Sequence, residues 1–97
     1  MINHTVLFKL KEETTATQKQ ELIDALQALG GKIDELKEIQ VKENFSDRSK
    51  GFDVVLYSIF DSKEALEAYQ VHPAHVKVVG ENVKPILADI LVADIEY

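Results

Sequence analysis

The segment Phe52-Asp-Val-Val-Leu-Tyr-Ser-Ile-Phe60 decides the fold of this 97-residue chain. Successive side chains of a β-strand point to opposite faces of its sheet, and apolar residues here fall on both faces. One face carries Phe52, Val54, Leu56 and Phe60, and the other carries Val55, Tyr57 and Ile59. The segment therefore predicts a strand inside a sheet that needs cover on both sides.

Alternation predicts three further strands. Ile2 to Leu10 opens the chain as a strand whose apolar face includes His4. Ile39 to Phe45 alternates with polar residues, which indicates a sheet edge or a solvent-facing side. Ile86 to Tyr97 forms the last strand, with Ile90, Val92 and Asp94 on one face and Leu91, Ala93 and Ile95 on the other. The polar segment 44–51 is expected to be the turn between the two middle strands.

A helical stripe follows the first strand and consists of Leu22, Ile23, Leu26 and Leu29. Thr14 to Thr17 are candidates for its cap, and Thr17 stands in capping-box spacing with Gln20. Gly30-Gly31 is expected to end this helix in a left-handed conformation. A further short turn of helix is expected from Ile33 to Leu36.

The second helical region contains a proline that divides it. Asp61 is expected to cap its first helix, with Glu64 in capping-box spacing. Proline disfavours the α conformation in the preceding residue and is well placed at the first position of a helix. The sequence therefore predicts a break at His72 and a second short helix from Pro73 to about Pro85.

The order strand, helix, strand, strand, helix, strand predicts a ferredoxin-like (βαββαβ) α+β fold with both helices on one face of a four-stranded antiparallel sheet. We expect a single domain over residues 1–97. So short a chain has no further helices for the second face, which leaves Val55, Tyr57, Ile59, Leu91, Ala93 and Ile95 open. A homodimer through the sheet faces is the expected cover.

The amino-acid composition limits the classes of binding partner and the cellular compartment that we expect for this protein. The net charge is −6, and no cluster of Lys and Arg offsets it, so nucleic acid and membrane surfaces are not expected as partners. The chain has no cysteine, which excludes disulfides and thiolate sites and fits a reducing cytoplasm. Its start lacks the pattern of a signal peptide.

The segment Tyr69-Gln-Val-His72-Pro-Ala-His75 is the strongest candidate for a site, because it holds two of the three histidines and a tyrosine. An imidazole can take a proton beside a carbonyl group, and a phenol can hold the resulting oxyanion, which makes His75 a candidate base and Tyr69 a candidate donor. The positive end of a helix starting at Pro73 would keep His75 neutral. In the competing structural interpretation, His72 caps a helix, His75 satisfies a carbonyl and Tyr69 packs.

Two other possibilities concern histidine. His4 on an apolar strand face is more often a core residue than a catalyst, although Asp94 can hydrogen-bond it and fix its tautomer if the register brings the two together. His72 and His75 with Asp61 or Glu64 offer metal ligands, but the proline breaks the spacing that would aim both rings at one ion. Neither a metal nor an organic cofactor is predicted.

Four segments together resemble the stress-responsive A/B barrel domain (Dabb) family over essentially the whole chain: His4-Thr-Val-Leu-Phe-Lys9, Phe60-Asp-Ser-Lys-Glu-Ala-Leu-Glu-Ala-Tyr69, His72-Pro-Ala-His75-Val76 and Val92-Ala-Asp94. The resemblance implies a ferredoxin-like domain that dimerises through its sheets into an α/β barrel with the helices outside. That family includes plant polyketide cyclases, which perform an aldol ring closure without metal or organic cofactor.

The resemblance to those cyclases puts a catalytic tyrosine at Tyr69, a catalytic histidine at His75 and a pocket histidine at His4. Their further pocket histidine falls at Val54, where this chain departs from the pattern. The expected ligand pocket lies between helices and sheet and comprises His4, Val6, Phe8, Val54, Leu56, Leu66, Val78 and Asp94. The prediction is cofactor-independent acid/base chemistry on a small carbonyl compound, of the aldol cyclase or isomerase kind. The alternative is a non-catalytic stress-responsive protein whose stable dimer is the functional unit.

Overall fold

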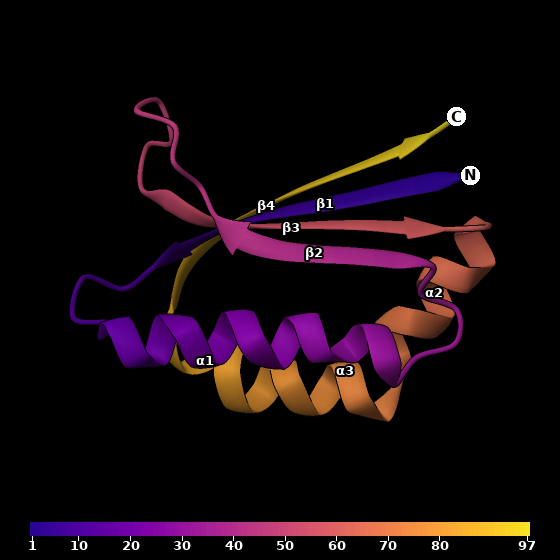
Figure 1. Cartoon of the computed structure of the whole chain (residues 1–97), viewed down its shortest axis with the longest axis horizontal. Coiled ribbons are helices and arrows are strands. Elements are labelled where there is room, and N and C mark those ends of the chain that lie inside the picture. Colours follow the sequence, from indigo (N-terminus) through magenta and orange to yellow (C-terminus); the bar gives the residue numbers. More distant parts are fainter.

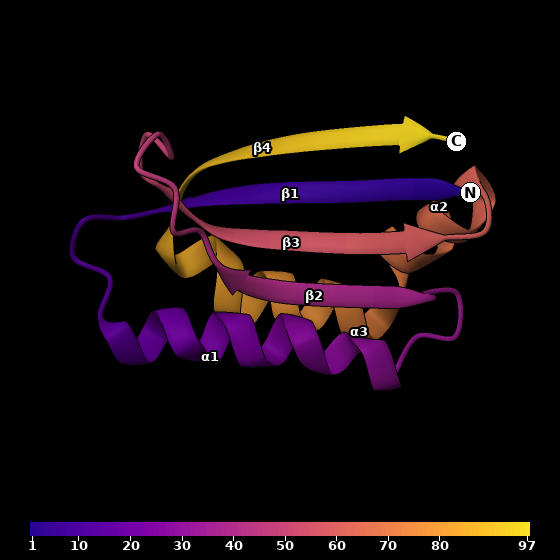
Figure 2. The ribbon, with the colours of Figure 1, turned by 45° about the horizontal axis from the view of Figure 1, so that its top comes forward.

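A computed structural model describes residues 1–97 and has the predicted ferredoxin-like order (Figure 1). The strands are β1 (Ile2–Leu10), β2 (Glu38–Glu43), β3 (Phe52–Phe60) and β4 (Leu87–Glu96). The α-helices are α1 (Ala16–Gln27), α2 (Lys63–Val71) and α3 (Pro73–Val78). The strands form one antiparallel sheet in the order β2-β3-β1-β4, and all helices lie on one side of it (Figure 2).

The register of the sheet places β1 between β3 and β4 and aligns its apolar face with theirs. Val6 lies opposite Leu56 on β3 and Val92 on β4, and His4 lies opposite Ser58 and Asp94. The even-numbered residues of β1 from Ile2 to Phe8 are buried under the helices. The pairing of β1 with β4 therefore brings His4 and Asp94 together, because both side chains lie on the helix-side face of neighbouring strands.

The hydrophobic core lies between this face and the helices. Its most deeply buried apolar side chains are Leu22, Leu26, Leu29, Val41, Val54, Phe60 and Tyr69. Edge strand β2 is also tied to α1 by one side chain. Gln27 donates from Nε2 to the Ile39 carbonyl and accepts at Oε1 from the Val41 N–H, both at 2.9 Å. This amide occupies backbone groups that an edge strand otherwise leaves unpaired.

The helix caps agree with the predictions in part. Thr15, one of the predicted candidates, caps α1, and the capping box pairs it with Gln18 instead of pairing Thr17 with Gln20: the Thr15 hydroxyl accepts from the Gln18 N–H, and the Gln18 side chain accepts from the Thr15 N–H. Ser62, not Asp61, caps α2 by accepting from the Ala65 N–H at 3.1 Å. The sequence offered adjacent polar candidates in both places, and both capping residues, Thr15 and Ser62, have an extended backbone.

Three loop predictions also need correction. Gly30 and Gly31 lie in a 3₁₀ turn, Ala28–Gly31, that extends α1, and neither has a positive φ. The 33–36 segment forms a turn without helix. Phe45 lies beyond the end of β2 and is fully exposed, because the strand ends at Glu43. The positive φ angles of this region belong to Lys50 and Gly51, within the predicted polar turn.

The region after α2 breaks at the predicted proline and then departs from regular helix. His72 is extended, and its Nδ1 accepts from the Ala74 N–H at 3.1 Å, so it caps α3. After α3 the chain forms a π-helix, Val79–Val83, and a 3₁₀ turn, Lys84–Ile86, before β4. A π-helix is a local widening that often occurs at functional sites.

The second face of the sheet carries no helix (Figure 1). Tyr57, Leu91 and Ile95 lie on this open face and are 37%, 53% and 58% exposed. Strand β4 is the most exposed of the strands, because it forms an edge of the sheet and the helices leave part of its other face bare. None of the helices combines the length and the apolar character that a membrane-spanning helix requires.

Candidate functional site

A cavity of about 280 Å³ lies between the helix-side face of the sheet and the helices. Strands β1, β3 and β4 form its floor, α1 contributes one wall, and the segment from α2 through the π-helix forms the other. The lining residues are His4, Val6, Phe8, Leu26, Leu56, Tyr69, Gln70, His75, Val79, Val83, Lys84, Leu87, Ile90 and Val92. The cavity is therefore mostly apolar and has a few polar groups, as is usual for sites that bind small organic molecules.

Three aromatic rings meet at one end of the cavity. The ring centroids of Tyr69 and His75 are 4.5 Å apart, and those of His4 and Tyr69 are 6.4 Å apart. His4 comes from β1, Tyr69 from the last turn of α2 and His75 from the first turn of α3. The break at His72 makes this possible, because it turns α3 so that His75 returns toward Tyr69.

Tyr69 is a buried phenol, with 1% of its surface exposed. Its ring packs against Phe60 at a centroid distance of 5.0 Å. Burial raises the pKa of Tyr69 to about 12, since removing water penalises the phenolate. The side chain is therefore a neutral hydrogen-bond donor at ordinary pH, and it cannot act as a base there.

His75 is half-buried and has a fixed tautomer. Its Nδ1–H donates to the backbone carbonyl of Gln70 at 3.1 Å, which leaves a lone pair on Nε2. Burial lowers the pKa of His75 below its ordinary value, and the nearby His4 and His72 rings act in the same direction against the hydrogen bond to Gln70. The ring is neutral at pH 7, as expected from the sequence, and burial is the largest cause of the lowered pKa.

His4 and Asp94 are hydrogen-bonded across the β1–β4 pair, from Nδ1 of the ring to Oδ1 of the carboxylate. The His4 side chain is 8% exposed, whereas the Asp94 side chain is 45% exposed. A carboxylate that accepts from Nδ1–H fixes the tautomer and leaves Nε2 as the second polar atom of the ring. The cavity thus has two imidazoles, each held through Nδ1 and each next to the Tyr69 ring.

Six of the ten residues predicted for the site line this one cavity: His4, Val6, Phe8, Leu56, Tyr69 and His75. The other four do not. Val54 is fully buried in the core, and Val78 is buried outside the lining. Leu66 and Asp94 line a neighbouring surface groove, from which Asp94 contacts the cavity only through His4. His72 also lies outside the cavity, in its capping role.

Sequence reasoning missed most of the far end of the cavity. Ile90 and Val92 could have been found, because they share a strand face with Asp94 and that face points to the helices. Val79, Val83 and Lys84 could not be assigned to one side of a helix from their spacing. A π-helix has a different period from an α-helix, and nothing in the sequence marks where it begins.

The arrangement is suited to moving a proton at a carbon atom next to a carbonyl group. Nε2 of a neutral histidine can accept the proton, and a neutral phenol can donate to the oxygen on which charge develops. The remaining lining is mostly apolar and can hold the hydrocarbon part of a small ligand. No three of the histidine, aspartate and glutamate side chains are close enough together to hold a metal ion.

Comparison with known proteins gives consistent relatives. Residues 2–97 match the family described as Stress responsive A/B Barrel Domain. The chain is 38% identical over 95 residues to a stress-response A/B barrel domain-containing protein of Arabidopsis thaliana, covering 97% of this chain and 36% of that protein. The chain thus spans about a third of this relative's length. It is 29% identical over 77 residues to olivetolic acid cyclase of Cannabis sativa, covering 77% of this chain and 76% of the cyclase.

Solved structures share the fold over nearly the full length. A crystal structure of an Arabidopsis thaliana protein superposes with a TM-score of 0.88 at 27% identity, covering 100% of this chain and 95% of that one. A protein from Thermobifida fusca, described as dimeric and ferredoxin-like, gives 0.87 at 27% identity, with 99% and 90% coverage. The hydroxynitrile lyase of Passiflora edulis gives 0.86 at 21% identity, with 97% and 90% coverage, a likeness of fold alone.

Proposed function

The chain belongs to the stress responsive A/B barrel domain family, and on that premise we propose that its cavity binds a small organic carbonyl compound and catalyses proton transfer on it without a cofactor. The reaction is of the aldol cyclase or isomerase kind. The observation that carries the proposal is that His4, Tyr69 and His75, from three different elements, meet in one apolar cavity. The name of the olivetolic acid cyclase relative agrees with this class of reaction.

In the proposed reaction, Nε2 of His75 takes a proton from the carbon next to the carbonyl group. The electron pair of the broken C–H bond moves onto the carbonyl oxygen, and the Tyr69 hydroxyl donates a hydrogen bond to the enolate. In an isomerisation the proton returns from His75 to another carbon. In an aldol closure the enolate carbon attacks a second carbonyl group, and the new alkoxide takes the proton.

His4 gives this site a second imidazole, held by Asp94. Its ring is farther from Tyr69 than the ring of His75 is, with centroid distances of 6.4 Å and 4.5 Å. We assign His4 the role of accepting a hydrogen bond at Nε2 from a hydroxyl group of the ligand, because its Nδ1–H already donates to Asp94. Removal of Asp94 is then expected to act through His4, by freeing its ring to rotate and change tautomer.

Deuterium exchange of ketone α-protons in heavy water tests the proposal without knowledge of the substrate. NMR would follow the exchange of a panel of methyl ketones with the unmodified protein, His75→Ala and His72→Asn, which retains a capping side chain outside the cavity. We expect exchange above the buffer rate, reduced by about 100-fold or more in His75→Ala, since a general base contributes at least that factor. Equal exchange by the unmodified protein and His75→Ala would contradict the assignment.

A homodimer through the open sheet face completes the proposal. Its supports are the exposed Tyr57, Leu91 and Ile95 on that face and the dimeric state named for a solved relative of similar fold. The same observations favour the second candidate function, a non-catalytic protein whose stable dimer is the functional unit. The two differ in the exchange experiment, because the second predicts no exchange above the buffer rate.

A further inference from the structure

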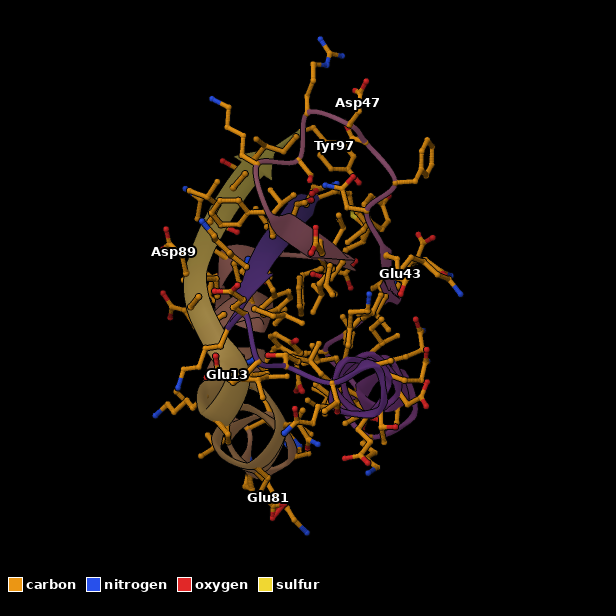
Figure 3. The ribbon with its side chains drawn as sticks, turned by 90° about the vertical axis from the view of Figure 1, so that its left-hand side faces the viewer. Glu13, Glu43, Asp47, Glu81, Asp89 and Tyr97 are labelled. Atoms are coloured by element: carbon orange, nitrogen blue, oxygen red, sulfur yellow. The ribbon has the colours of Figure 1, made fainter.

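The cavity has a lysine at the end away from the histidines, and the proposed proton transfer does not use it. Lys84 is the one lysine or arginine in the lining, and it takes part in none of the four ion pairs of the structure. The chain has 17 Asp and Glu residues, yet none of them lines the cavity. Figure 3 shows Glu43, Glu81 and Asp89 directed outward, away from the space between sheet and helices. An acidic protein thus has a cavity whose unpaired charge is positive.

The two polar ends are separated by the length of the cavity. His4 and Phe8 both line it and are four residues apart on β1, which corresponds to roughly 13 Å. The Phe8 end is the Lys84 end, because the Lys11 N–H at the end of β1 donates to the Ile86 carbonyl at 2.8 Å. From His75 to Lys84 the chain advances nine residues along the opposite wall, again roughly 13 Å at helical rise.

The ends also differ in charge. Tyr69 and His75 are both neutral at pH 7, because burial raises the pKa of the first and lowers that of the second. They suit a carbonyl or hydroxyl group better than a carboxylate. Between the ends, the lining is apolar and consists of Val6, Phe8, Leu26, Leu56, Val79, Val83 and Leu87. A ligand that matches all three zones is neutral and polar at one end, hydrocarbon in the middle and anionic at the other end.

We propose, building on the carbonyl chemistry proposed above, that the ligands of this cavity are oxo carboxylates, with the carboxylate at Lys84 and the carbonyl group at Tyr69 and His75. Lys84 then determines specificity and orientation, because it binds the carboxylate end of the ligand and so leaves the carbonyl end at Tyr69 and His75. It takes no part in the proton transfer.

Binding of octanoate, octanol and octylamine to the full chain tests this inference. The three probes share one hydrocarbon chain and differ in the charge of the end group. NMR titration would follow the amides of 79–84, so that binding in the cavity is distinguished from binding elsewhere. The variants are Lys84→Gln and, as a matched control, Lys77→Gln, which removes an exposed charge of α3 outside the lining.

We expect the unmodified protein and Lys77→Gln to prefer octanoate over octanol by about threefold to fivefold at low salt, as an exposed ion pair allows. This preference should disappear in Lys84→Gln and decrease at high salt, because the lysine is exposed and screened. Octylamine should bind most weakly. Equal binding of octanoate and octanol to the unmodified protein, or a preference that persists in Lys84→Gln, would overturn this inference alone. Absence of binding by all three probes would overturn the proposed ligand cavity as well.

Discussion

Tyr69 combines a packing role and a proposed chemical role, and its two parts can be separated. Its ring contacts Phe60 and His75, while its hydroxyl is the proposed donor. Tyr69→Phe keeps the ring, so we expect the free energy of unfolding to change by no more than about 1 kcal/mol. The α-proton exchange rate should fall by about 100-fold, the usual cost of losing one oxyanion donor.

Urea denaturation and the exchange assay measure the two effects on the same samples. Tyr69→Ala is the contrasting variant, because it also removes a fully buried ring and should cost about 3 to 5 kcal/mol of stability. If Tyr69→Phe exchanged α-protons as fast as the unmodified protein, the tyrosine would be a packing residue only.

His75 makes stability depend on pH in a direction fixed by its environment. Burial lowers its folded-state pKa below the ordinary 6.5, so the unfolded chain binds the proton first as pH falls. Between 6.5 and the lower folded pKa, the unfolded state carries more protons, and the free energy of unfolding decreases with decreasing pH. His75→Gln abolishes this term, so its urea midpoint should fall less than that of the unmodified protein between about pH 7 and about pH 5. Parallel changes in both proteins would show that His75 does not contribute to the pH dependence of stability.

At the residue scale, the sequence predicted Tyr69 and His75 as candidate site residues, and the structure places both in the lining of one cavity. These two residues could be predicted because the short segment from Tyr69 to His75 holds a tyrosine and two of the three histidines of the chain. The His4–Asp94 bond depended on the register of β1 against β4, which alternation alone does not fix. Lys84 was not predicted as a site residue, because its position in the cavity lining depends on the π-helix before it.

At the element scale, the strands were predictable and the helix ends were not. A period of two identifies a strand over its whole length, as in β3, whose bounds match the predicted ones. A cap depends on one hydroxyl, and a run of threonines offers several. Thr15→Ala should therefore destabilise the protein by about 1 kcal/mol, because it removes the acceptor for the Gln18 N–H.

Thr17→Ala is a matched control for Thr15→Ala, since Thr17 is also an exposed threonine, lies two residues further along α1 and makes no cap. It should change the free energy of unfolding by no more than about 0.5 kcal/mol. Thermal or urea denaturation of the two variants side by side decides the point. Equal destabilisation by the two variants would contradict the assignment of Thr15 as the residue that caps α1.

At the scale of the whole molecule, β4 contributes to two surfaces: the open face of the sheet and the ligand cavity on the other face. Its residues alternate between the open sheet face, which we propose to be the dimer interface, and the cavity side. The apolar residues on both sides of β3 predicted that both faces of the sheet pack against something. On one face, the helices provide this packing, as predicted (Figure 1). The same alternation makes the other face apolar, and that face carries no helix (Figure 1).

Leu91 and Val92 test this division, because they are neighbours on β4, are each 53% exposed, and lie on opposite faces. Leu91→Glu places a carboxylate on the open face, and burying it in a dimer without a partner charge is unfavourable. Sedimentation velocity should therefore show a folded monomer for Leu91→Glu and a dimer for the unmodified protein and Val92→Glu. Val92→Glu puts the same charge into the cavity lining, so it should weaken octanoate binding, which Leu91→Glu in turn should retain. A Leu91→Glu protein that sediments as a dimer would place the interface on another surface.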